Sequence, residues 1–250
     1  MVMKKVSIIT VCYNSEKTIR RTIESVLNQS YPNIEYIIVD GRSSDRTMSI
    51  VEQYKGSFGE KLITISEPDK GIYDAMNKGI HLASGELIGI INSDDYYDTQ
   101  AVMHMVQAMK EERYQILYGF VRAWKKGKEY SVSRQSHAFM KESMIGHPAC
   151  FVTKAVYDDF GCFDQRYVSV ADYDFMLRMK EIPEVKFHPV DFVIANFTLG
   201  GMSASETAWL DLLKLRRDHG IISEKEYKKE ILKSKVYRFY KQCLHGKGSS

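Results

Sequence analysis

Residues 1–98 repeat one pattern four times: a short apolar stretch, a polar break, and then apolar residues at helical spacing. The apolar stretches are rich in β-branched residues and cover residues 6–12, 34–40, 62–65 and 88–91. Stretches of this length and composition predict buried strands, and the spacing after them predicts helices. Strands that alternate with helices over short connections are typical of a parallel sheet with helices on both faces. The chain is therefore predicted to be an α/β protein with a mainly parallel, Rossmann-like sheet.

The regular alternation ends near residue 98. Beyond it the pattern predicts helices at 100–109, 154–160 and 171–179, and strands at 116–124, 129–133, 147–152, 185–187 and 192–197. Residues 135–146 show no periodicity and predict a mobile loop. We therefore expect one domain over residues 1–202, with halves 1–98 and 99–202, and a C-terminal helical extension over 203–250.

The C-terminal extension carries two capping-box spacings, Ser203 with Glu206 and Ser223 with Glu226, which predict two helices. The second of these helices is rich in lysine between residues 225 and 241. Two interpretations remain open. The helix either packs on the domain with a solvated lysine face, or presents a basic surface that associates peripherally with an anionic membrane.

The overall composition argues against several classes of protein. The chain has 250 residues, 44% of them hydrophobic, and a formal net charge of +3, which does not indicate a nucleic-acid partner. Four cysteines without a CxxC pair argue against a zinc site and a disulfide framework, and favour a reducing compartment. The N-terminus leaves no room for a secretory leader, and no apolar run is long enough to span a bilayer. A cytoplasmic location is therefore expected.

Polar side chains follow all four predicted strands of the first half. Thr10 and Tyr13 lie at the end of the first strand, Asp40 ends the second, Asp69 follows the third, and Asp94 follows the fourth. The carboxyl ends of parallel strands share one edge of the sheet, where such folds bind nucleotides. An aspartate could accept from a uracil N3–H or a ribose hydroxyl, the backbone near Thr10 could pair with the base, and Tyr13 could stack on it. The chain has no GxGxxG and no P-loop, which argues against a dinucleotide and a P-loop nucleotide site.

Residues 92–95 read Asn-Ser-Asp-Asp, directly after the fourth strand. Adjacent carboxylates repel each other, so they are solvated or share a cation, and hard oxygen ligands suit Mg²⁺ or Mn²⁺. The alternative is a strand followed by an acidic turn that caps a helix. The residues alone leave both interpretations open.

Six segments together resemble family 2 of the glycosyltransferases, whose fold is called GT-A, and in particular its members that make bacterial surface polysaccharides. They occur in the family's order within the first 200 residues, at 6–14, 39–45, 67–79, 83–86, 92–95 and 171–174. The resemblance implies that the half 1–98 binds a nucleotide-sugar and that the half 99–202 binds the acceptor.

The resemblance also implies roles for single residues. Asp94 would be the principal ligand of Mn²⁺ or Mg²⁺, and Asp172 would be the catalytic base, although an aspartate there could equally cap a helix. His147 would contact the acceptor or make a structural hydrogen bond. The implied donor-binding residues are Thr10, Val11, Tyr13, Asp40, Asp69, Lys70, Gly71, Asn92 and Ser93.

Three residues depart from the family's pattern. Asn92 stands where Asp is more usual, Met76 where many members have Arg, and Ala171 where Glu is more usual. Lys70 could supply the positive charge that Met76 lacks. Asn92 and Ala171 also permit the alternative that the chain is a non-catalytic nucleotide-sugar-binding subunit of a polysaccharide assembly complex.

The expected reaction is an inverting, metal-assisted single displacement. One sugar would move from a nucleotide-sugar, expected to be a UDP-sugar, to a hydroxyl of a glycan or lipid-linked acceptor in bacterial polysaccharide biosynthesis. The Gln-x-x-Arg-Trp segment of processive synthases is absent, which favours single additions. A nucleotidyltransferase is disfavoured because residues 12–15 lack the glycine-rich loop that such enzymes place after the first strand.

Overall fold

The computed structural model describes residues 3–200 and 206–245. The chain divides into two compact units: a sheet domain of Met1–Arg166 with Ala171–Gly201, and a C-terminal unit of Tyr167–Val170 with Met202–Ser250. None of the helices in the described ranges combines the length and hydropathy of a membrane-spanning segment.

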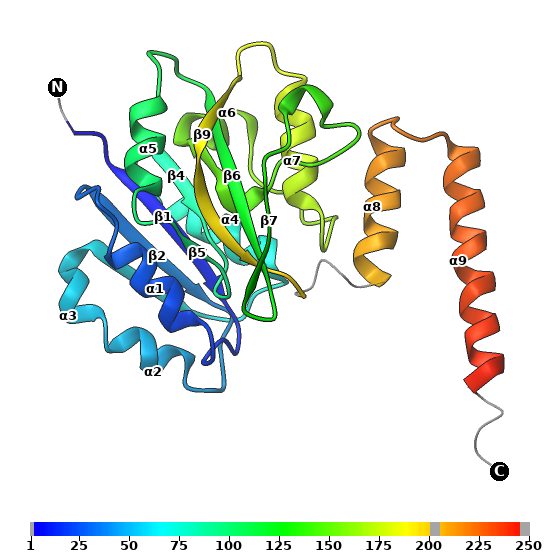
Figure 1. The fold of residues 1–250 in the computed structure, drawn as a ribbon, viewed down its shortest axis with the longest axis horizontal. Coiled ribbons are helices and arrows are strands. Elements are labelled where there is room, and N and C mark those ends of the chain that lie inside the picture. Colours follow the sequence, from blue (N-terminus) through cyan, green and yellow to red (C-terminus); the bar gives the residue numbers. More distant parts are fainter. Residues whose placement is uncertain (1–2, 201–205, 246–250) are drawn as a thin grey trace. The chain divides into compact units, whose positions relative to one another are not determined.

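A nine-stranded sheet forms the centre of the sheet domain (Figure 1). Its first half is parallel, in the order β3-β2-β1-β4, and consists of β1 (Val6–Cys12), β2 (Ile34–Asp40), β3 (Leu62–Ser66) and β4 (Leu87–Ile90). The sheet continues through β8-β6-β9-β5, where pairing is antiparallel except between β6 and β9, and β7 pairs with β6. The bounds of these strands are β5 (Tyr96–Tyr97), β6 (Gln115–Lys125), β7 (Lys128–Ser133), β8 (Cys150–Thr153) and β9 (Lys186–Thr198). The predicted α/β fold is confirmed.

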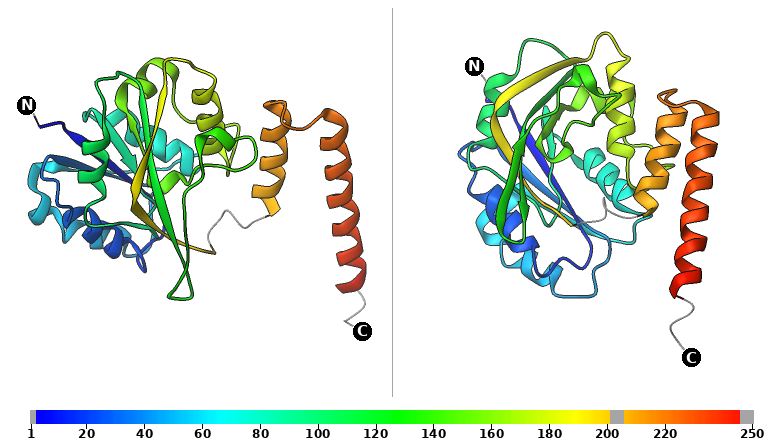
Figure 2. Two further views of the ribbon diagram at one scale, coloured as in Figure 1. Left: turned by 45° about the horizontal axis from the view of Figure 1, so that its top comes forward. Right: turned by 45° about the vertical axis from the view of Figure 1, so that its right-hand side comes forward.

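Helices cover both faces of the parallel strands, so every residue of β1, β2 and β4 is buried. Side chains of β1 that point to one face, such as Ile8, share a core with Ile19 and Ile23 of α1. On the other face Gly79 of α4 lies so close to Ile9 that a Cβ would collide with it. Figure 2 shows α1 to α3 on one side of β1 and β2, and α4 on the other. The helices of the domain are α1 (Ile19–Leu27), α2 (Thr47–Glu52), α3 (Lys55–Phe58), α4 (Ile72–Leu82), α5 (Ala101–Ala108), α6 (Lys154–Phe160) and α7 (Ala171–Lys180).

Three predictions for the second half need correction. The two strands expected at 185–187 and 192–197 are one strand, β9. The strand expected at 147–152 begins with a 3-10 turn, His147–Ala149, before β8. The expected mobile loop at 135–146 is irregular but anchored, because Met140 and Ile145 are fully buried.

Glu35 of β2 is buried at the end of the sheet opposite to the strand carboxyl ends, with a side chain only 5% exposed. Its carboxylate forms an ion pair with the Lys5 ammonium at 2.5 Å. It also accepts hydrogen bonds from the Ser7 hydroxyl and, at 2.6 Å, from the Ser84 backbone N–H. Burial alone would raise the pKa of Glu35, but these hydrogen bonds outweigh burial and lower it to about 2.

We expect Glu35→Gln to cost about 3 kcal/mol of unfolding free energy at pH 7. The folded-state pKa lies below the ordinary value of 4.5, so this stability is fully present above pH 4.5 and is lost as pH falls toward 2. Urea unfolding at pH 7 and at pH 3 measures both effects. The matched control is Glu86→Gln, because Glu86 is 56% exposed beside Lys4 and should contribute only about 0–1 kcal/mol. A loss no larger than that of the control would contradict the prediction.

The C-terminal unit contains the helices α8 (Glu206–Asp218) and α9 (Glu224–His245). The predicted capping box at α9 is confirmed, because the Glu226 N–H donates to Ser223 Oγ at 3.2 Å and the Ser223 N–H donates to the Glu226 carboxylate at 2.8 Å. Ser203 lies outside the described residues. Lys225, Lys228 and Lys229 of α9 are exposed, and membrane association through them stays a prediction.

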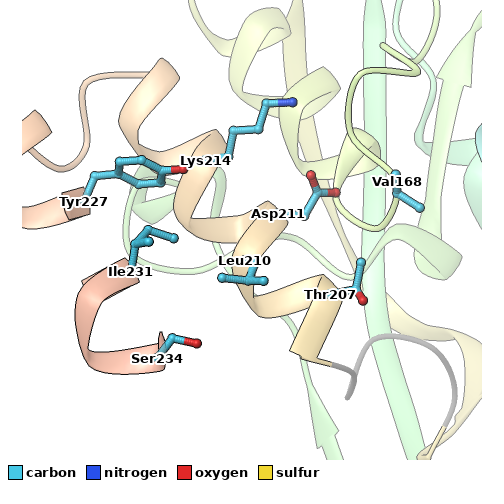
Figure 3. Close-up of a pocket in the computed structure, with 8 residues that line it drawn as sticks. All are labelled: Val168, Thr207, Leu210, Asp211, Lys214, Tyr227, Ile231 and Ser234. Carbon is cyan, nitrogen blue, oxygen red and sulfur yellow. The ribbon is translucent and has the colours of Figure 1, made fainter. Parts of the chain in front are cut away.

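Residues 167–170 belong to the same unit and are tied to α8. Tyr167 Oη donates to Asp218 at 2.8 Å, and the Ser169 N–H donates to Asp211 at 2.8 Å. A pocket of about 360 Å³ lies within this unit (Figure 3). It is lined by Val168, Thr207, Leu210, Asp211, Lys214, Tyr227, Ile231 and Ser234.

Candidate active site

The ends of β1 and β2 and the loop after β3 meet at one edge of the sheet. Gly41 follows β2, and a Cβ at Gly41 would collide with the Asp69 carboxylate and lie 3.4 Å from the Tyr13 ring. The Tyr13 side chain is 65% exposed. An exposed aromatic ring and a carboxylate are thus next to each other at the carboxyl ends of parallel strands, as the sequence predicted.

Thr10 and Asp40, two of the predicted donor-binding residues, direct their side chains into the protein. The Thr10 hydroxyl is buried and accepts from Tyr36 Oη at 3.0 Å, while Val11 is buried beside it. The Asp40 carboxylate is fully buried and accepts from the Ser43 N–H at 3.0 Å and the Ser66 hydroxyl at 2.6 Å. Their contacts to a nucleotide stay predictions, and for Thr10 the backbone is the group left to make them.

The loop between β3 and α4 is shaped by its own side chains. Asp69 accepts from the Gly71 N–H at 2.9 Å, and the Lys70 N–H donates to Asp74 at 3.0 Å. Gly71 has a φ of 124°, a conformation that side-chain-bearing residues rarely adopt. The loop therefore needs glycine at this position, and it leaves the Lys70 side chain exposed.

The turn at residues 92–95 is fixed through its backbone. The Asp95 N–H donates to the Asn92 carbonyl at 3.1 Å. The Asp94 carbonyl accepts from the Arg21 guanidinium at 2.6 Å and from the Thr198 hydroxyl at 3.0 Å. Two elements distant in the sequence, α1 and the end of β9, thus hold the peptide that carries the Asp94 side chain.

The side chains of this turn leave polar atoms without partners. Asn92 Oδ1 is buried and accepts no hydrogen bond from the described residues. The Asp94 carboxylate is half-buried and likewise makes no hydrogen bond within residues 3–200 and 206–245. Ser93 differs, because its hydroxyl is 2.8 Å from Ser15 Oγ of the loop after β1.

Asp94 and Asn92 fit an Mg²⁺ or Mn²⁺ ion that is shared with a substrate. Both offer hard oxygen atoms, which these ions prefer. The described residues contain no group of three His, Cys, Asp or Glu side chains that could hold a metal by themselves. Mg²⁺ is commonly held by one or two carboxylates together with water and substrate phosphates, so two protein oxygens suffice for this kind of site.

Asp95 has a different environment from its neighbour. It is fully buried, and its Oδ1 accepts from the Thr198 N–H at 2.9 Å. Burial, and after it the nearby charge of Asp94, raise the pKa of Asp95 to about 8. The sequence shows two equivalent aspartates, whereas the structure leaves only Asp94 accessible to a ligand.

Asp172 lies in the first turn of α7, where the helix dipole favours negative charge. Its Oδ1 accepts from Tyr73 Oη of α4 at 2.7 Å and from the Tyr173 N–H at 3.0 Å. The described residues donate no hydrogen bond to its second oxygen, Oδ2. Sequence reasoning did not single out Tyr73, although this residue lies within segment 67–79, one of the six that carry the family resemblance.

His147 is only 8% exposed, and its ring packs edge-on against Phe163 at 6.1 Å between centroids. Burial lowers the pKa of His147, and the charge of Asp172 opposes this shift. The neutral imidazole is therefore favoured. A contact between His147 and an acceptor stays a prediction.

Residues 7–174 match the protein family described as Glycosyl transferase family 2. This match covers more than half of the chain. It includes the parts of the site from the end of β1 to Asp172, whereas Thr198 at the end of β9 lies outside it.

Two relatives of the chain in bacteria are named as glycosyltransferases. A PGL/p-HBAD biosynthesis glycosyltransferase of Mycobacterium tuberculosis is 28% identical over 200 residues, which are 79% of this chain and 78% of that protein. A UDP-Glc:alpha-D-GlcNAc-diphosphoundecaprenol beta-1,3-glucosyltransferase of Escherichia coli is 38% identical over 112 residues, which are 44% of this chain and 43% of that protein.

Solved structures share the fold. S. aureus TarS 1-349 in complex with UDP-GlcNAc has a TM-score of 0.71 at 20% identity, over 89% of this chain and 69% of that chain. The mannosyltransferase PcManGT from Pyrobaculum calidifontis, in complex with GDP-Man and Mn²⁺, has a TM-score of 0.61 at 16% identity, over 94% of this chain and 69% of that chain.

Proposed function

This chain belongs to glycosyl transferase family 2, and we propose that it transfers one sugar from a UDP-sugar to a hydroxyl of a glycan or lipid-linked acceptor in bacterial polysaccharide biosynthesis. The observation that carries the proposal is the pair of carboxylates, Asp94 and Asp172, that the protein's own hydrogen bonds leave available. Asp94 follows a strand of the parallel half, where it would bind a cation together with the donor's diphosphate. Asp172 lies in the first turn of α7, where it would accept a proton from the acceptor hydroxyl.

The nucleoside end of the donor would lie over the edge formed by Tyr13, Gly41 and Asp69. The exposed Tyr13 ring offers a face for the base, and Asp69 offers an acceptor for a base N–H or a ribose hydroxyl. Uridine is favoured because the S. aureus structure holds UDP-GlcNAc and the E. coli relative is named for UDP-Glc. The GDP-Man complex of PcManGT is the reason for including other nucleotides in the test.

The diphosphate end of the donor would approach Asn92 and Asp94. These residues would hold Mn²⁺ or Mg²⁺, which when bound neutralises charge on the departing diphosphate. Arg21 and Thr198 donate to the Asp94 backbone carbonyl, so the backbone that carries this carboxylate is fixed before the donor arrives. Lys70, exposed on the loop before α4, would add positive charge.

The acceptor hydroxyl would lie against Asp172. A hydroxyl is a poor nucleophile, and a carboxylate within hydrogen-bond reach takes its proton as attack begins. Asp172 Oδ2 is the atom proposed for this proton, since Oδ1 is already engaged. Attack from the side opposite the diphosphate would invert the anomeric centre. A lipid-linked acceptor is favoured because the E. coli relative is named for a diphosphoundecaprenol substrate.

The experiment is a donor screen. The purified chain is incubated with UDP-, GDP- and dTDP-sugars, with and without Mn²⁺, and free nucleoside diphosphate is measured. We expect slow, metal-dependent release of UDP from one UDP-sugar, because water replaces the missing acceptor. Binding of a UDP-sugar without release, with or without candidate acceptors, would contradict a transferase and favour the non-catalytic subunit.

A further inference from the structure

We propose that Tyr73 is a positioning residue for sugar transfer: its phenol fixes the Asp172 carboxylate so that one chosen oxygen faces the acceptor. This inference rests on the proposed function, in which Asp172 receives the acceptor's proton. Tyr73 belongs to α4, in the half of the domain proposed to bind the donor. The inference gives it a role in the proton transfer proposed at the start of α7.

The hydrogen bonds around Asp172 make its two carboxylate oxygens different from each other. Tyr73 Oη and the Tyr173 N–H both donate to Oδ1, at 2.7 and 3.0 Å. Because two donors converge on one oxygen, the rotation of the carboxylate is restricted and Oδ2 is presented in a defined direction. Without the phenol, only the adjacent backbone N–H would hold the side chain. A catalytic base that is held by a third group in this way needs less reorganisation when substrate binds.

Tyr73 is itself held rigidly. It is 7% exposed, and its ring packs on Phe163 with centroids 5.5 Å apart. One turn later on α4, Asn77 donates to the Phe163 carbonyl at 2.9 Å and accepts from the Phe163 N–H at 3.1 Å. This double hydrogen bond fixes α4 to the segment before α7. The phenol is therefore placed by packing that does not depend on Asp172.

The Tyr73 phenol acts as the hydrogen-bond donor toward the Asp172 carboxylate. Burial, and after it the charge of Asp172, raise the pKa of Tyr73 far above its ordinary value, so the phenol keeps its proton at neutral pH. The charge of Asp172 also acts on His147 and Cys150, both of which are buried. Neither has a hydrogen bond to Asp172 in the described residues, which leaves Tyr73 as the side chain that orients it.

The test is Tyr73→Phe, which keeps the ring against Phe163 and removes only the hydroxyl. We expect kcat for transfer to the acceptor to fall roughly tenfold, the effect of losing a hydrogen bond to a charged group, while the KM for the donor and the affinity for UDP stay unchanged. The matched control is Tyr157→Phe. Tyr157 also packs on Phe163, is 5% exposed, and makes no hydrogen bond to Asp172, so its kcat should stay at the wild-type value.

A double-variant cycle separates positioning from packing. In a protein that already carries Asp172→Asn, adding Tyr73→Phe should change kcat little, because Tyr73 acts through the base. Equal losses in both backgrounds, or an unchanged kcat in Tyr73→Phe alone, would overturn the role of Tyr73. Full activity of Asp172→Asn would overturn the base itself and Tyr73 with it. Absence of nucleoside diphosphate release from any donor would instead contradict the proposed function.

Discussion

Asp172→Asn is expected to slow sugar transfer by roughly 10²–10⁴-fold, the range typical of general base catalysis. The amide keeps the shape of the side chain, and its oxygen can still accept from Tyr73 Oη and the Tyr173 N–H. The substitution removes the basic oxygen proposed to take the acceptor's proton. Donor binding should survive, because Asp172 lies outside the strand-end edge. Steady-state kcat and calorimetric UDP affinity, measured on the same preparation, check both halves of the prediction.

The control for Asp172→Asn is Asp158→Asn. Asp158 is an exposed helix carboxylate on α6 that pairs with Lys154 at 2.7 Å, so its loss should leave kcat unchanged. Transfer that persists at the wild-type rate in a folded Asp172→Asn variant would mean that another group takes the proton. His147 would then be the next residue to test, because its ring is also near Phe163.

The parallel half of the fold was predictable because its signal is local. Each strand of that half is a short run rich in β-branched residues, and burial on both faces favours runs that are mostly apolar. The glycines and polar residues between them mark the turns. The confirmed strands β1 to β4 therefore begin and end within a residue or two of the predicted positions.

The second half was less predictable because tertiary pairing overrides the local signal. Pro189 and Asp191 interrupt the apolar pattern of 185–197, which predicted two strands. In the structure β9 continues through them, and the register against β6 shifts between Tyr118 and Val121, where the irregularity is absorbed. A shift of this kind depends on the partner strand, so the run itself does not reveal it.

The sequence motifs predict candidate residues of the site, whose roles stay predictions, but they do not predict the contacts that hold these residues. The motifs gave Asp94 and Asp172, whereas the groups that hold them come from elsewhere: Arg21 for the Asp94 backbone, and Tyr73 for the Asp172 carboxylate. Tyr73 is 99 residues before its partner, and no spacing rule links them. Ser15 illustrates the same limit, because its hydroxyl meets Ser93 in another loop.

Asp94→Asn is the second substitution with a large expected effect, and it should remove the metal dependence of UDP binding. Its carboxylate is the accessible charged oxygen donor of the turn, next to the unpartnered Asn92 Oδ1. Loss of a group that merely supports a metal ligand costs about 10–100-fold in metal affinity, so loss of the principal ligand should cost at least about 100-fold. Calorimetric titration of UDP with and without Mn²⁺ measures the difference.

Asp95→Asn is the matched control, since it replaces the carboxyl group of the adjacent aspartate with an amide of the same shape. Its amide oxygen can still accept from the Thr198 N–H, and the side chain is fully buried, so a ligand has no access to it. We therefore expect Asp95→Asn to keep metal-dependent UDP binding, with any loss confined to the melting temperature. If Asp95→Asn abolishes the metal effect while Asp94→Asn retains it, the assignment of the two carboxylates is wrong. If both variants retain it, the cation is held by the donor's phosphates without this turn.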